Sequence, residues 1–332
     1  MAEEAGGTTE PGTPRSGGAR PRSAGASPGG QAPPPTGAET RVDWAQRPEG
    51  YRPRLVRRIC AAVLGVVLVG GLAWAALRSP VGQALDTVLM ESVMSWDGAL
   101  GRLGAVVTGL VSLEASVVVA AVVVVVALLR RRPTLAGRAL GIALGANATT
   151  QLLKAALDRP DLGVSTVLEN SLPSGHVTFA ASVSLALVVV APEWFRTPAA
   201  WLGWLWTSLM GVTVMVSAWH RPADVITAVA VAGTWALLLS PIEHRVRHAT
   251  VMRRVMGVIA LVLVVLAVIG IAVALAGTDL GAQAMPGATE FGFSTFLHAH
   301  PWRERLLALC CAGLVTGVVG VVVHEVDRLS WS

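Results

Sequence analysis

The sequence is poor in charged residues and has almost no lysine. Charged residues make up 14% of the 332 positions and hydrophobic residues 53%, whereas soluble proteins have about 25% charged residues. This composition excludes a single water-soluble globule. All of the 26 basic residues except Lys154 are arginine. Because most of them flank apolar runs instead of forming a basic stripe, the net charge of +5 does not indicate nucleic-acid binding.

Cysteine is also scarce, and its three occurrences show no metal-type spacing. Cys60 and Cys310 lie within apolar runs, and we interpret them, with Cys311, as small core residues. His298 and His300 lie two positions apart, which favours an ordinary surface pair over a metal site. We therefore predict no metal site.

Large apolar side chains are nearly absent from residues 1–50, which are rich in Gly, Pro, Ala, Ser and Thr. Such a segment cannot bury enough apolar surface to offset the cost of ordering the chain, so we expect a disordered cytoplasmic tail. A secretory signal peptide would place an apolar stretch near Met1, and none is there. The first membrane segment is therefore expected to remain as an anchor.

The rest of the chain consists of long uncharged runs, and a transmembrane helix needs about 20 such residues. The runs predict an all-α fold, a polytopic membrane helical bundle. Residues 79–102 carry acidic residues among apolar ones and instead predict an interfacial amphipathic helix. The eight predicted transmembrane helices are 59–77, 106–129, 136–156, 176–191, 198–219, 223–239, 255–276 and 306–323.

Arginines concentrate in alternate loops, which the positive-inside rule assigns to the cytoplasm. These loops precede the first helix, join the second to the third, and join the sixth to the seventh. Both termini are then cytoplasmic, and we expect a multi-pass protein of the plasma (cell) membrane. The arginines concerned are Arg52, Arg54, Arg57, Arg58, Arg130, Arg131, Arg132, Arg138, Arg245, Arg247, Arg253 and Arg254.

Three polar clusters interrupt the apolar pattern, and the topology places all of them at the outer surface. Taken singly, they have ordinary explanations: a snorkelling lysine, a helix N-cap and the first turn of a helix. Together they supply cations, a helix N-terminus and two histidines, which phosphoryl transfer requires. The clusters are Lys154 with Asp158-Arg159-Pro160, Pro173-Ser174-Gly175-His176, and His220-Arg221-Pro222-Ala223-Asp224.

These clusters resemble the motifs of the type 2 phosphatidic acid phosphatases (PAP2), whose superfamily also includes the vanadium haloperoxidases. Pro173-Ser174-Gly175-His176 is intact, and so is the spacing from His220 to Asp224. The resemblance implies a six-helix PAP2-like core over residues 55–242. It leaves a C-terminal transmembrane hairpin over residues 255–323 and a cytoplasmic tail over residues 324–332.

The resemblance also implies roles for individual residues. His220 resembles the nucleophile that forms a phosphohistidine, and Asp224 resembles the carboxylate that orients its ring. His176 resembles the general acid that protonates the leaving oxygen and later activates water. The family uses no metal and no other cofactor. The residues that resemble phosphate ligands are Lys154, Ser174 and Gly175.

Two motif arginines of the family are displaced or absent. The first motif has Asp161 where the family has arginine, and the third has Val214. Arg159 is the better substitute, because the proline that follows it disfavours helical geometry and lets the chain turn back over the outer face. Arg221, adjacent to His220, is a second candidate phosphate ligand that we expect to point the other way.

The leading hypothesis is therefore a metal-independent phosphatase that hydrolyses a lipid phosphate or diphosphate at the outer leaflet. Its partners would be the lipid phosphate substrate and the bilayer, with no nucleic acid. The missing arginines favour an alternative, a catalytically inactive phospholipid-binding or scaffold protein of the same fold. A transporter is a third hypothesis, but few charged residues lie outside the three clusters, and a translocation path usually needs more.

Overall fold

The computed structural model describes residues 51–109, 133–165, 167, 169–240, 250–285 and 292–330, and single positions at 118, 121, 122 and 125. All regular structure in this part of the chain is helical, which confirms the predicted all-α class. The predicted tail 1–50, and the predicted helix 106–129 beyond residue 109 apart from those single positions, lie outside the described residues. The helices are α1 (Tyr51–Arg78), α2 (Pro80–Met94), α3 (Asp97–Gly109), α5 (Pro133–Ala156), α6 (Gly175–Val190), α7 (Glu193–Val216), α8 (Pro222–Leu239), α9 (Thr250–Leu275), α10 (Leu280–Gln283), α11 (Ser294–Ala299) and α12 (Pro301–Ser330).

Five of the described helices have the length and apolar composition of membrane-spanning segments. They are α1, α7, α8, α9 and α12. Helix α6 is apolar but has only 16 residues. Apolar surface remains exposed along α1 and α9 in particular, where Leu64 and Leu261 are more than half exposed. A surface of this kind is what a hydrocarbon environment accepts, so the described part of the chain fits the predicted polytopic bundle.

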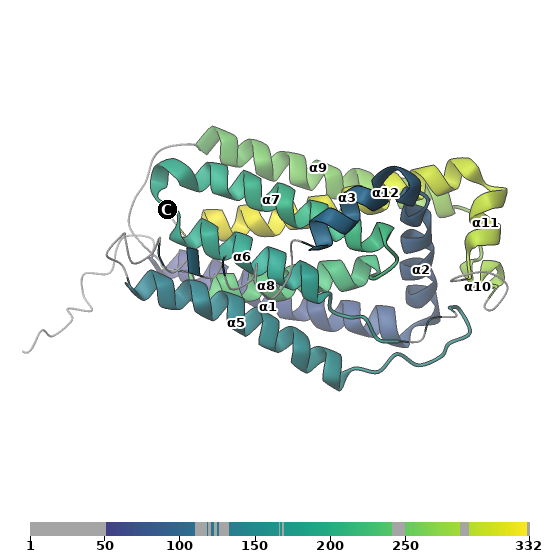
Figure 1. Cartoon of the computed structure of the whole chain (residues 1–332), viewed down its shortest axis with the longest axis horizontal. Helices are drawn as coiled ribbons and strands as arrows, with labels where there is room; N and C mark the ends of the chain where they lie inside the picture. Colours follow the sequence, from purple (N-terminus) through teal and green to yellow (C-terminus); the bar gives the residue numbers. More distant parts are fainter. Residues whose placement is uncertain are drawn as a thin grey trace, which may run out of the picture. The chain divides into compact units, whose positions relative to one another are not determined.

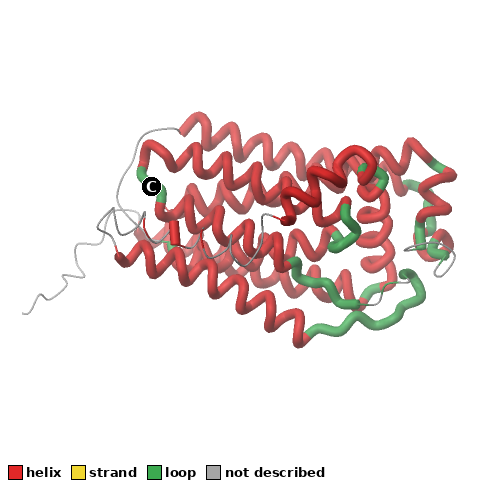
Figure 2. The backbone as a smooth tube through the Cα atoms, viewed as in Figure 1, coloured by secondary structure: helices red, strands yellow, loops and turns green. Residues whose placement is uncertain are grey.

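The core of the bundle lies around α6, which packs against α5, α7 and α8 (Figures 1 and 2). Its residues Val177, Leu185 and Val188 are at most 1% exposed. Close approach between neighbours depends on small residues, and Gly145 of α5 is an example. A Cβ atom added there would lie 2.6 Å from the ring of Trp235 on α8. These contacts fix the lateral positions of the helices whose ends carry the polar clusters.

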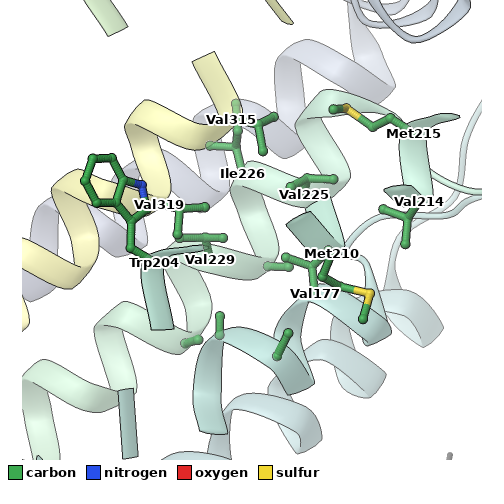
Figure 3. Close-up of a cluster of buried hydrophobic side chains, with 14 of the residues drawn as sticks. Val177, Trp204, Met210, Val214, Met215, Val225, Ile226, Val229, Val315 and Val319 are labelled. Carbon is green, nitrogen blue, oxygen red and sulfur yellow. The ribbon is translucent and has the colours of Figure 1, made fainter. Parts of the chain in front are cut away.

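Helix α12 is part of this core and does not lie at its margin. It packs against α9, α7, α8 and α2. Val315 and Val319 lie among Met210, Val225 and other buried side chains, as Figure 3 shows. α12 also continues to Ser330 through most of the segment predicted to be a tail, 324–332. Helix α9 packs along α12.

The predicted interfacial helix 79–102 is instead two helices, α2 and α3, separated at Ser95 and Trp96. In Figure 1, α2 lies across one end of the bundle at a steep angle to the other helices. Its acidic residues do not face water, since Asp86 is 6% and Glu91 7% exposed. Both carboxylates accept backbone N–H groups of other segments, which is why an apparently amphipathic sequence is buried here.

Candidate active site

The carboxylate of Asp224, in the first turn of α8, is the centre of the third cluster. Its Oδ2 atom accepts hydrogen bonds from His220 Nδ1 at 3.2 Å, from the Arg221 backbone N–H at 2.9 Å and from Ser171 Oγ at 2.5 Å. The helix begins at Pro222, whose fixed φ suits a first helical position and whose missing N–H leaves no donor unpaired. Asp224 is fully buried, so these donors hold its charge in place.

His220 is oriented from both of its ends. Its backbone N–H donates to the Val214 carbonyl at 3.2 Å, at the end of α7. Between these residues the chain turns through Ala218, whose φ of 57° lies in the left-handed region. With the Nδ1 proton donated to Asp224, the Nε2 atom keeps its lone pair. The ring is thus arranged as a nucleophile requires.

The second cluster is joined directly to the third. The backbone N–H of Ser174 donates to the Asp224 carbonyl at 3.1 Å. The Ser174 hydroxyl accepts the Val177 N–H at 3.4 Å, so Ser174 is the N-cap of α6. The first N–H groups of a helix have no hydrogen-bond partner within it. They create a positive potential at the helix N-terminus, which favours the binding of an anion. His176 lies in this turn, with its ring 5.5 Å from that of Trp219.

The first cluster reaches the site from α5. Ile142, Ala146 and Thr150 follow one another at intervals of four residues and are fully buried, so they share the face of α5 that carries Lys154. A hydrogen bond of 2.8 Å between the hydroxyls of Thr150 and Thr178 fixes α5 against α6. Lys154 and His220 both lie within electrostatic reach of His176.

Arg159 is buried in the loop that follows α5. Only 7% of it is exposed, and its Nε and Nη2 atoms have no hydrogen-bond partner among the described residues. Burial and the neighbouring charge of Arg221 lower the pKa of Arg159 to about 10, so it remains protonated at neutral pH. The carboxylates of Asp86 and Asp224 oppose this shift. The arginine is therefore inside the cluster and has donors to offer.

Arg221 is buried as well, but its side chain holds a loop. Its Nη2 donates to the Val167 carbonyl at 3.1 Å and to Ser165 Oγ at 3.4 Å, and its Nη1 to Ser171 Oγ at 3.5 Å. It nevertheless lies close enough to Arg159 for charge repulsion. The two arginines therefore differ in what they can do: Arg221 is largely committed to the loop, and Arg159 is not.

The positions of the two missing motif arginines are structurally clear. Val214 is fully buried in the apolar core (Figure 3). Asp161 is exposed, and its carboxylate accepts the Gly163 N–H at 2.9 Å within its own loop. Neither position supplies a cation, so positive charge in this site comes from Lys154, Arg159 and Arg221.

Several buried polar atoms of the cluster have no hydrogen-bond partner among the described residues. Buried polar atoms are almost always paired, so such a group of exceptions needs a physical reason. Three belong to arginine side chains, whose donors could bind a ligand rich in acceptor oxygens, and two are carboxylate oxygens. The atoms are Arg159 Nε and Nη2, Arg221 Nε, Asp224 Oδ1 and Asp86 Oδ2.

Residues 139–248 match the family model of the PAP2 superfamily. This segment, about a third of the chain, is similar to the PAP2 superfamily. This confirms the family predicted from the motifs, and the matched segment contains every predicted site residue, from Lys154 to Asp224. Comparisons with the curated proteins and with the solved structures give no match.

Four residues beside the PAP2 motifs were not predicted as part of the site. Ser171 and Trp219 contact Asp224 and His176, and both lie close to a motif in the sequence. Gln83 and Asp86 come from α2, outside the matched segment. In the sequence, Asp86 is an acidic residue among apolar ones. On a predicted amphipathic helix, such a residue is expected on the solvent-exposed face and not in a buried site.

Cavities adjoin the turn that carries Trp219 and His220. One of about 450 Å³ is lined by Trp219, Ser217 and Asp97, and another of about 830 Å³ shares Ser217 and Asp97 with it. Among the described residues, no group of three or more His, Cys, Asp or Glu side chains is placed to hold a metal ion. The site is thus a set of histidines and cations beside open volume.

Proposed function

We propose that the protein is an integral-membrane phosphatase that hydrolyses a lipid phosphate or diphosphate through a phosphohistidine. The observation that carries the proposal is the double role of Asp224. Its carboxylate orients His220, and its carbonyl anchors the turn that carries His176. The candidate nucleophile and the turn of the candidate acid are thereby both hydrogen-bonded to Asp224, which lies near buried arginine side chains.

In the proposed reaction, His220 Nε2 attacks phosphorus, and the bond from phosphorus to the leaving oxygen breaks. His176 gives a proton to that oxygen, so the alcohol or phosphate departs in its protonated form. Water then attacks the phosphohistidine while His176 takes up a proton, which restores His220 and releases inorganic phosphate. Lys154, Arg159 and the N-terminus of α6 stabilise the charge that spreads over the three remaining phosphate oxygens.

An amphiphilic substrate is supported by the setting of the site. It lies at the ends of apolar helices, where lipid head groups would be, and the neighbouring cavities give room for the rest of such a molecule. At the opposite end of α8, Arg58 donates to the carbonyls of Leu237 and Ser240. By the positive-inside rule that end is cytoplasmic, so the site would face the outer leaflet of the plasma membrane.

A non-catalytic phospholipid-binding protein is the second candidate. It is favoured by Val214, because a buried valine replaces a cation that the family places beside the phosphate. In this reading, Arg159 and Lys154 still bind a lipid phosphate, but turnover is lost.

Phosphate release separates the two functions. The full-length protein in detergent is given phosphatidic acid, phosphatidylglycerol phosphate or polyprenyl diphosphate. We expect the parent to release phosphate from at least one of them, His220→Ala to release none, and His324→Ala, a histidine near the C-terminal end of α12, to match the parent. If the parent binds these lipids but releases no phosphate from any of them, the scaffold function replaces the enzymatic one.

A further inference from the structure

Helix α2 lies outside the segment that matches the PAP2 family model, yet two of its side chains hold parts of the candidate site. Gln83 and Asp86 are three positions apart, so they share one face of the helix. Gln83 is 1% exposed, and its Nε2 donates to the carbonyls of Pro160 at 3.1 Å and Leu77 at 3.2 Å. Pro160 directly follows Arg159. Gln83 therefore fixes the backbone from which the candidate phosphate-binding arginine projects.

Asp86 makes the matching contact to the other wall. Its Oδ1 accepts the backbone N–H of Ala223 at 2.8 Å. Ala223 stands between Pro222 and Asp224 in the first turn of α8, so this bond fixes the turn that orients His220. The second oxygen of Asp86, Oδ2, is buried and has no hydrogen-bond partner among the described residues. One face of α2 thus connects the Arg159 loop with the histidine turn.

We propose that Gln83 and Asp86 are positioning residues of the phosphate site, and that ionisation of Asp86 weakens the binding of a phosphate dianion there. This inference rests on the proposed function, since it assumes that the cluster binds a phosphoryl group. Gln83 acts through Arg159. Asp86 acts through the first turn of α8 and through its own charge.

The charge argument follows from the groups that face Asp86. They are Asp224 of α8, Arg221 at its N-cap, Arg159 of the loop and the Cys311 thiol of α12. Burial and the Asp224 carboxylate raise the pKa of Asp86 to about 7, although the Ala223 N–H and the two arginines act in the opposite direction. Asp86 therefore becomes negative as the pH rises through neutrality, and an anion bound nearby meets a new repulsion.

Sulfate is a suitable probe, because its charge is constant from about pH 6 to about pH 8.5 and it cannot be hydrolysed. Its dissociation constant is measured by calorimetry on the full-length parent and on Asp86→Asn, which keeps an acceptor for Ala223. Glu193→Gln makes the same charge change at an exposed position in the first turn of α7, away from the site and its cavities, and is the control. Groups that titrate independently of Asp86 are common to the proteins, and their effect cancels in the ratio of the dissociation constants.

We expect Asp86→Asn and the parent to bind sulfate equally at about pH 6, and Asp86→Asn to bind about ten-fold more tightly at about pH 8.5. Glu193→Gln should follow the parent at both values. A ratio of parent to Asp86→Asn that does not change with pH overturns the role of the Asp86 charge.

Gln83 is tested by a double-mutant cycle with Arg159. If Gln83 were merely structural, its effect on sulfate binding would not depend on the presence of Arg159. Gln83→Ala should weaken sulfate binding about five-fold, a loss that its hydrogen bond to Pro160 can account for. In an Arg159→Ala background the same change should have no further effect. Gln151→Ala, an exposed position on α5, is the control. Equal losses in both backgrounds overturn the positioning role.

Failure of this inference differs from failure of the proposed function. If the parent releases phosphate in a His220-dependent manner while the sulfate ratio is flat, only the role of α2 is wrong. If the parent neither releases phosphate nor binds sulfate, the proposed function is wrong and the inference is wrong with it.

Discussion

The backbone carbonyl of Asp224 accepts the N–H of Ser174 at 3.1 Å, and this bond joins two motifs that are fifty residues apart in the sequence. Because Asp224 also holds His220, a shift in the α6 N-terminus would move the candidate nucleophile with it. The geometry of both candidate catalytic histidines therefore depends on one buried residue.

His176 is expected to act as the general acid. His176→Ala should lower kcat by about 10² to 10⁴ for a lipid with an alkoxide leaving group, because that oxygen then departs without a proton. The loss should be much smaller for an aryl phosphate, whose leaving group needs no proton. The ratio of the two kcat values is the measurement. Equal losses on both substrates would show that His176 does not donate the proton.

Arg159 is expected to matter more than Arg221 for turnover. Its Nε and Nη2 are unpaired among the described residues, whereas Arg221 is largely engaged with the loop from Ser165 to Ser171. Losing a charge-assisted contact costs about 1.5–3 kcal/mol, so Arg159→Ala should lower kcat/KM at least about ten-fold. Arg221→Ala should lower it less, and the exposed Arg305→Ala not at all. An unchanged kcat/KM in Arg159→Ala would exclude this arginine as a ligand.

Ser171 tests whether the orientation of Asp224 matters. Its hydroxyl donates to Asp224 Oδ2 at 2.5 Å, and bonds to charged groups contribute about 1.5–3 kcal/mol. Ser171→Ala should therefore lower kcat by roughly ten-fold, with a smaller change in KM because substrate contacts remain. Ser171→Thr keeps the donor and should restore most of the rate. A loss in Ser171→Thr as large as in Ser171→Ala would indicate that the hydroxyl is not what matters.

The attachment of α12 can be tested without touching the site. Arg196 of α7 and Asp327 of α12 form a buried ion pair with 2.6 Å between Arg196 Nε and Asp327 Oδ1. Removing one partner leaves a buried charge, so Arg196→Ala should reduce the free energy of unfolding by about 3–5 kcal/mol. Arg57 forms a looser, exposed pair with Glu325, and Arg57→Ala should cost less than about 1 kcal/mol.

Thermal unfolding in detergent compares these two variants with the parent. If Arg196→Ala unfolds at the parental temperature, α12 is not fastened to the core in the way the contacts indicate.

Much of the fold followed from the sequence, because hydropathy and helix length record burial in a bilayer directly. The helix starts at Pro133, Gly175 and Pro222 lie within three residues of their predicted positions. The burial of α2 did not follow, since an acid satisfied by a distant backbone N–H looks the same in sequence as one facing water. Asp86 finds its partner Ala223 only in the folded chain, 137 residues away.

The candidate site divides in the same way. The three clusters could be predicted because short spacings place side chains on one helix turn, as for His220 and Asp224. The proline after Arg159 favoured a turn of the chain back toward the site, and Arg159 is buried near Asp224; its role as a substitute cation stays a prediction. The loop contacts of Arg221 and the role of Gln83 depend on tertiary packing, which no local pattern records.

The orientation of the site is expected to be outward. With the native cysteines replaced, a cysteine at the exposed Asp161 or Ala282 should react with a membrane-impermeant maleimide on intact cells. A cysteine at position 249, in the arginine-rich segment that the positive-inside rule assigns to the cytoplasm, should react only after lysis. The reverse pattern would place the site, and its lipid, in the inner leaflet.

The most direct test of the account is the detection of a phosphohistidine on His220. The full-length protein is mixed with phosphatidic acid carrying a radioactive phosphate, quenched in base during the first turnover, and digested to locate the label. We predict label on the peptide that contains His220 and none in His220→Ala. The label should increase in a medium of low water content, because the second step, hydrolysis of the phosphohistidine, is then slower. Phosphate release by the parent without any protein-bound label, or label that persists in His220→Ala, would contradict the central claim.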